Sequence, residues 1–161
     1  MYFWSVFFHL IFISFWIGGM LFTGAVLVPA TRNRLKSQRS LLMAELGTRF
    51  SRISWILFIL IILTGLLALY GRGFPTEAIL SASFWDTPYG SALMGKLHLF
   101  ATVLIISGIH DFWLGPKAVR LMESDEDSEK ARKFTKTSSW VGRINLILGL
   151  AILFYAVDMI R

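Results

Sequence analysis

Four long segments of the chain are nearly free of Lys, Arg, Asp and Glu, and this leaves few folds open. They cover residues 2–30, 53–70, 91–114 and 140–157. An α-helix needs about 20 apolar residues to cross about 30 Å of hydrocarbon. Closed β-barrels are the other backbone solution in lipid, but they show short alternating segments, whereas these runs are continuous. The pattern predicts an all-α integral membrane protein, a four-helix bundle forming a single domain over residues 1–161.

Composition supports this fold class and excludes several kinds of site. Hydrophobic residues make up 55% and charged residues 16% of the chain, against about 45–50% and about 25% in soluble domains. The absence of cysteine excludes disulfides, zinc–thiolate sites and iron–sulfur clusters. The net charge of +6 does not indicate nucleic acid as a partner, because the basic residues lie in loops beside the spans.

The placement of those basic residues predicts an orientation. Between the first and second spans lie Arg32, Arg34, Lys36, Arg39, Arg49 and Arg52, and between the third and fourth lie Lys117, Arg120, Lys130, Arg132, Lys133, Lys136 and Arg143. The positive-inside rule places both loops in the cytoplasm. Both termini and the loop 71–90 would then face outward, toward the periplasm if this is a bacterial inner (plasma) membrane. The first loop is long enough for a short interfacial helix at 41–46, ended by Gly47.

Ionisable groups inside a membrane are costly and are functional candidates by default. Here they are His9, Lys96, His98, His110 and Asp111. Helix geometry places His9 close to the outer interface and His98 about 10 Å along the third span, at a similar depth.

The helix faces of these two histidines also look compatible. The face of His9 also carries Ser5, Phe12, Trp16, Gly19 and Thr23, and that of His98 carries Ser91, Gly95 and Thr102. Each face gathers small and polar groups, which is typical of positions facing the bundle interior. Two imidazoles facing each other across a bundle can ligate copper or a haem iron, and Met94 offers a soft thioether nearby. A purely structural role, in which each imidazole bonds to backbone or water, remains open. Lys96 would either extend to the headgroups or, held inward, balance a haem propionate or another anion.

His110 is expected at a different depth in the membrane. It lies twelve residues after His98, about 18 Å further along the helix, where no second histidine is available. Asp111 follows it and could orient its imidazole. The pair is either an ordinary interface-facing histidine with a helix-end acid or the inner exit of an ion or proton path. No phosphate-binding loop, nucleophile elbow or zinc-protease signature is present, so no catalytic residue is predicted.

Several short motifs follow one another in an order typical of one membrane family. They are HL at 9–10, FWIGGMLF at 15–22, VP at 28–29, RFSR at 49–52, TG at 64–65, YG at 89–90, KL at 96–97, HDF at 110–112 and GP at 115–116. Together they resemble the CopD family of copper-resistance membrane proteins in its short form. The resemblance implies a four-helix unit that handles copper, with His9, His98 and Met94 as outer metal contacts. Copper-binding segments rich in Met or Cys are missing.

A weaker similarity links the chain to the HemJ family of protoporphyrinogen oxidases, small four-span haem proteins. The Leu-His pair and the Lys of that family would correspond to His9 and Lys96. The Tyr-His endings of its first and third spans are absent here.

Three functional hypotheses follow. The first is a CopD-like protein that binds copper near its outer face and transports it across the inner membrane. The second is a membrane protein or oxidoreductase with haem b held by His9 and His98 or Lys96, the one reading in which the protein is an enzyme. The third is a structural subunit without metal. The lipid bilayer and a metal ion or haem are the expected partners, and a homo-oligomer or a membrane partner subunit stays open.

Overall fold

A computed structural model describes residues 1–32, 35–124 and 128–158 of the chain. Within these residues the chain is helical and contains no strand. In order the elements are α1 (Tyr2–Phe22), a π-helical turn (Thr23–Leu27), α2 (Val28–Arg32), a 3-10 turn (Lys36–Gln38), α3 (Arg39–Gly71), α4 (Thr76–Leu80), α5 (Ala82–Trp85), α6 (Pro88–Ile109), a second π-helical turn (His110–Leu114), α7 (Gly115–Ser124) and α8 (Glu129–Asp158). The predicted all-α fold is confirmed.

Four helical segments are long and apolar enough to cross a membrane, as the apolar pattern predicted. They are Tyr2–Arg32, Arg39–Gly71, Pro88–Ser124 and Glu129–Asp158, with 31, 33, 37 and 30 residues. At about 1.5 Å per residue each measures about 45–55 Å, well beyond about 30 Å of hydrocarbon. The helices therefore extend past the apolar segments from which the spans were predicted.

The first loop differs most from its prediction. The expected interfacial helix at 41–46 is the beginning of α3, which runs without a break from Arg39 to Gly71. Gly47 does not end it, because a single glycine costs a helix only about 1 kcal/mol relative to alanine. The helix ends instead at Gly71. Gly73, two residues later, has a positive φ of 88°, the left-handed conformation that commonly follows a helix C-terminus.

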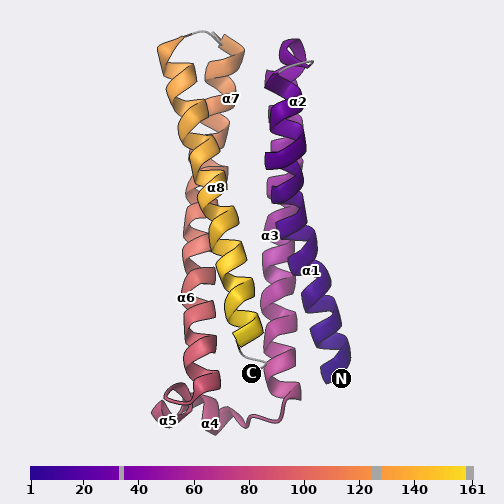
Figure 1. Cartoon of the computed structure of the whole chain (residues 1–161), viewed down its shortest axis with the longest axis vertical. Coiled ribbons are helices and arrows are strands. Elements are labelled where there is room, and N and C mark those ends of the chain that lie inside the picture. Colours follow the sequence, from indigo (N-terminus) through magenta and orange to yellow (C-terminus); the bar gives the residue numbers. More distant parts are fainter. Residues whose placement is uncertain (33–34, 125–127, 159–161) are drawn as a thin grey trace.

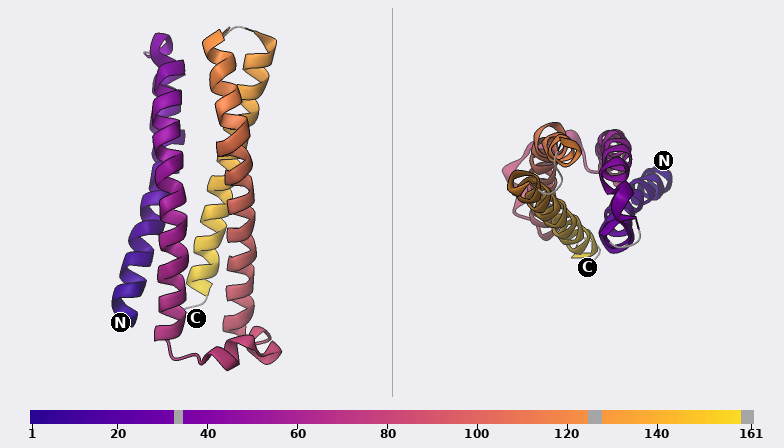
Figure 2. Two further views of the ribbon diagram at one scale, coloured as in Figure 1. Left: turned by 180° about the vertical axis from the view of Figure 1, so that it is seen from behind. Right: turned by 90° about the horizontal axis from the view of Figure 1, so that it is seen from above.

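The four segments pack as two hairpins, α1 with α3 and α6 with α8. Figure 1 shows that α1 begins and α8 ends at the same end of the molecule, which α4 and α5 also occupy. We call this the terminal end. The opposite end carries α2, α7 and the beginnings of α3 and α8, and most of the lysines and arginines; we call it the basic end. Viewed along the bundle in Figure 2, the two hairpins stand side by side.

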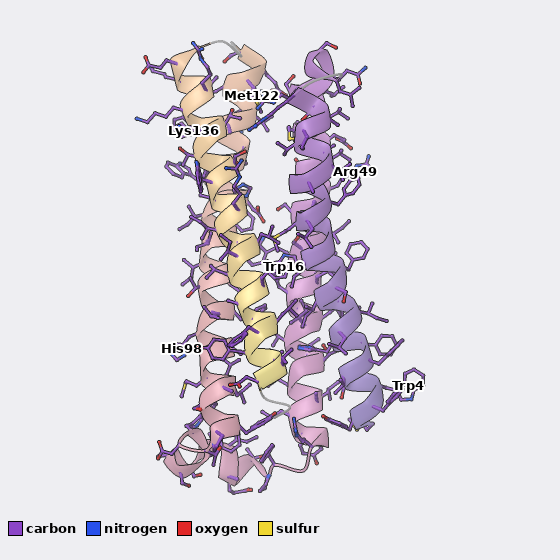
Figure 3. The ribbon with its side chains drawn as sticks, viewed as in Figure 1. Trp4, Trp16, Arg49, His98, Met122 and Lys136 are labelled. Carbon is purple, nitrogen blue, oxygen red and sulfur yellow. The ribbon has the colours of Figure 1, made fainter. Side chains whose placement is uncertain are left out.

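An aromatic core joins the hairpins. Trp16 of α1 lies at the centre between them (Figure 3) and is 4% exposed. Its ring packs edge-on against Phe58 of α3 at 5.2 Å, and Phe58 in turn packs against Phe100 of α6 at 5.8 Å. Gly149 of α8 makes room for the indole, since an added Cβ there would lie 3.2 Å from Trp16 Cζ3. The outer faces of the helices are largely apolar and exposed, as lipid contact requires.

Candidate functional site

His9 lies on the inward side of α1 and bonds to α3. It is half-buried, with Nδ1 3.0 Å from Thr64 Oγ1. Thr64 donates its single hydroxyl hydrogen to the Leu60 carbonyl at 2.6 Å, so its oxygen must accept from His9. We therefore assign the ring proton to Nδ1. This leaves the Nε2 lone pair, the form in which imidazole ligates a metal.

A second feature of α3 limits the movement of the His9 ring. Gly65 faces it, and a Cβ added at Gly65 would lie 3.2 Å from His9 Cε1. Because the proton side of the imidazole is held by α3, the ring can turn little without losing its hydrogen bond.

Lys96 of α6 is half-buried and its ammonium acts electrostatically on His9. The ion pairs found among the described residues do not include it. Its half-burial indicates that the side chain packs in part against the bundle. A cation held next to a neutral imidazole favours an anion in this region and opposes a second cation.

His98 and Met94 lie elsewhere. Both are exposed on α6, and His98 Nδ1 lies 2.8 Å from the Met94 carbonyl of its own helix. Figure 3 labels His98 on the α6 side of the bundle, across from α1. The structure does not bring the two imidazoles together on one interior site.

The reason is that the interior face of α6 differs by one residue from the face predicted from the sequence. The predicted stripe on the third span was Ser91, Gly95, His98 and Thr102. The interior face of α6 instead carries Ala92, Val103 and Ser107, all buried, with Lys96 at the same helical spacing. Tyr155 of α8 packs against Gly95, where a Cβ would lie 2.8 Å from its ring. A shift of one residue turns a helix position by about 100°.

His110 and Asp111 form the contact expected from their adjacency. His110 Nδ1 lies 2.8 Å from an Asp111 carboxylate oxygen, and Nε2 lies 3.0 Å from Ser138 Oγ of α8. They open the π-helical turn that ends at Leu114, two residues before Pro116. Pro116 has no N–H for the Phe112 carbonyl four residues earlier. In the wider turn, the Gly115 N–H bonds to the His110 carbonyl five residues earlier.

The prediction from sequence missed the hydroxyl partners of these histidines. Thr64 and Ser138 have no metal-ligating chemistry of their own, and they matter only through the imidazoles that they contact. A hydroxyl within an otherwise apolar run, as at Thr64, was the available signal. A group of three or more His, Cys, Asp or Glu residues able to hold a metal is not found in the part of the chain that the structure describes.

The fold and these interior polar groups define a multi-pass membrane protein built as a four-helix bundle. Residues 44–158 match the family model of copper resistance protein D, CopD, and the chain belongs to that family. It is also similar to an uncharacterized protein of Aquifex aeolicus (strain VF5), with 32% identity over 153 residues, 94% of this chain and 90% of the relative. No solved structure matches significantly. The match begins after His9, so the family does not by itself assign a role to α1.

Proposed function

We propose that this protein binds copper inside the terminal end of the bundle, with His9 as a ligand, and passes it across the membrane. Membership of a family named for copper resistance supports the choice of metal. The observation that carries the site is the imidazole of His9, whose proton side is held by Thr64. Neutral imidazole is a common copper ligand, and its orientation by a second group is typical of metal sites.

The basic end would provide the other contact of this path. His110 is the remaining interior histidine of the chain, oriented by Asp111 and by Ser138. Polar groups within a bundle mark ion pathways in many membrane proteins. In the proposed path, ions enter near His9 and leave past His110, on the side where the basic loops lie.

A second candidate function is binding of haem b, and Lys96 is the observation that favours it. Its charge near His9 would oppose a copper ion but would suit a haem propionate. The donor set fits this group in part: His9 can supply an axial nitrogen and Lys96 a cation. His98 is exposed and would not be the second ligand of the same iron. The bound haem would supply redox chemistry, and the chain would hold and orient it.

An absorption spectrum and metal analysis of the purified protein separate the two functions. Copper binding predicts stoichiometric copper without a Soret band, lost in His9→Ala and retained in the control His98→Ala. Haem binding predicts a Soret band that is lost in His9→Ala.

Lys96→Met adds a test of opposite sign. Removal of the ammonium should tighten copper binding, because one repulsive charge is gone, but it should weaken haem binding, because the propionate loses its partner. A protein that takes up neither copper nor haem, in both the wild type and Lys96→Met, would refute both functions.

A further inference from the structure

Four buried polar atoms toward the basic end of the bundle have no hydrogen-bond partner among the described residues. Three of them lie close to the aromatic core: Ser54 Oγ and Trp55 Nε1 of α3, and Asn145 Oδ1 of α8. Ser54 is 4% and Asn145 8% exposed. Each unmet group costs free energy, and the cost is larger where lipid rather than water surrounds the bundle.

These atoms belong to one layer, as the contacts of the aromatic core show. Trp16 packs against Phe58 and Gly149. One turn toward the basic end, α3 presents Ser54 and α8 presents Asn145, since residues four apart share a helix face.

The third helix contributes to the same layer. Asn145 Nδ2 donates to Ser107 Oγ of α6 at 2.8 Å. The indole of Trp55 covers the neighbouring residue of α6, with Cζ2 4.0 Å from the position of a Cβ added at Gly108. α3, α6 and α8 thus surround a common polar spot. We name Ser54, Trp55, Ser107 and Asn145 the polar layer.

The chemistry of the polar layer suits a neutral guest. The Asn145 carbonyl oxygen and the Ser54 hydroxyl can accept hydrogen bonds, whereas the indole N–H of Trp55 can only donate. A buried N–H donor in the polar layer opposes a bare metal cation. Water both donates and accepts, and buried water typically makes about three such bonds.

The polar face of α8 continues toward the basic end. Thr135 and Ser138 lie on the same face as Asn145 at helical spacing, and Thr135 Oγ1 is also buried without a partner in the described chain. Between Ser138 and Asn145 lies Gly142, which is exposed and where an added Cβ would meet nothing within 4 Å. The face is therefore open at Gly142.

We propose that the polar layer is an internal hydration site. It holds water between α3, α6 and α8, and this water enters from the side of the basic end through the opening at Gly142. The proposal does not depend on whether copper or haem binds near His9. The interior of the bundle would then have a dry aromatic core around Trp16 and, one helical turn closer to the basic end, the hydrated polar layer.

The absence of native cysteine allows a direct test in the full chain. A thiol reacts as the thiolate, which forms readily only in contact with water. A small charged methanethiosulfonate reagent should therefore modify Ser54→Cys at least about tenfold faster than Leu57→Cys, which is equally buried in the dry core of the same helix. Equal rates for the two variants, or an unreactive Ser54→Cys, would overturn the hydration site.

Two valine substitutions test the route. In the Ser54→Cys background, Gly142→Val should slow modification several-fold because its side chain fills the opening. Gly24→Val is the matched control, since Gly24 is also exposed and has nothing within 4 Å of an added Cβ. An undiminished rate in Gly142→Val would rule out this entrance.

Stability gives an independent readout that needs no reagent. If Ser54 bonds to water, Ser54→Ala removes that bond and lowers the melting temperature. If the layer is dry, the same substitution removes an unpaired buried hydroxyl and raises it. A rise in the melting temperature would contradict the proposal.

Discussion

Thr64 lies within an apolar helix, and its hydroxyl determines which nitrogen of His9 is available. The hydroxyl hydrogen is donated to the Leu60 carbonyl and the oxygen accepts from Nδ1. His9 therefore has a defined tautomer and a ring held against Gly65. At the scale of single residues, the candidate site is a histidine whose Nε2 is left available because a neighbouring threonine accepts a hydrogen bond from Nδ1.

Loss of this hydrogen bond should weaken binding at His9 without removing the ligand. We expect Thr64→Val to lower copper affinity about 10–100-fold, the usual effect of losing a group that orients a metal ligand. The measurement is competition with a copper chelator of known affinity. Thr102→Val is the control, because Thr102 Oγ1 bonds only to the His98 carbonyl of its own helix. An equal loss in both variants would argue against a specific role for Thr64.

At the scale of the helices, close packing depends on Gly149. The indole of Trp16 occupies the space in which a side chain at this position would lie, and this contact joins the two hairpins.

A larger residue at Gly149 should force the hairpins apart. Overpacking of this kind costs about 1–3 kcal/mol, so we expect Gly149→Val to lower the melting temperature in detergent by several degrees. Gly18 lies two residues after Trp16 in α1, but a Cβ added there has nothing within 4 Å, so Gly18→Val should leave the melting temperature unchanged. If the two variants have the same melting temperature, the contact between Trp16 and Gly149 does not hold the two hairpins together.

At this scale, some features of the helices could be predicted from the sequence and others could not. Continuous apolar runs identify four spans because lipid demands them. The helix ends were not predicted, since polar helix formers such as those at 129–139 continue the backbone hydrogen bonds beyond the apolar part. The inward face of α1 was recognised from its stripe through Trp16. That of α6 was not, because it carries Lys96 and apolar residues while the neighbouring stripe carries small and polar ones.

The two π-helical turns belong to this scale as well. Each ends two residues before a proline, Pro29 in α2 and Pro116 in α7. A wider turn accommodates a residue that lacks an N–H and whose ring would clash with the carbonyl four residues earlier. The prolines were visible in the sequence, but whether each would kink, end or widen its helix depends on the packing of the segments around it.

At the scale of the whole molecule, the charge distribution predicts a direction in the membrane. Exposed lysines and arginines gather at the basic end, and such residues remain in the cytoplasm during insertion. We propose that the terminal end, with α4 and α5, faces outward.

Single-cysteine variants of the full chain test this orientation. Ser83 is exposed in α5 at the terminal end, and Ser37 is exposed at the basic end. In intact cells with a permeable outer envelope, a membrane-impermeant maleimide should label Ser83→Cys, and Ser37→Cys only after the membrane is opened. The reverse order would place the basic end outside and contradict the proposed direction of copper entry.

The return of the chain to its starting side has a consequence for how larger proteins can arise from this one. Because four crossings are an even number, the end of α8 lies at the same end as the beginning of α1. Two copies fused head to tail would need only a short linker on that side, and both would keep the same orientation. A gene duplication could thus produce an eight-span protein with two parallel copies of the His9 site, without an added crossing or an inverted half.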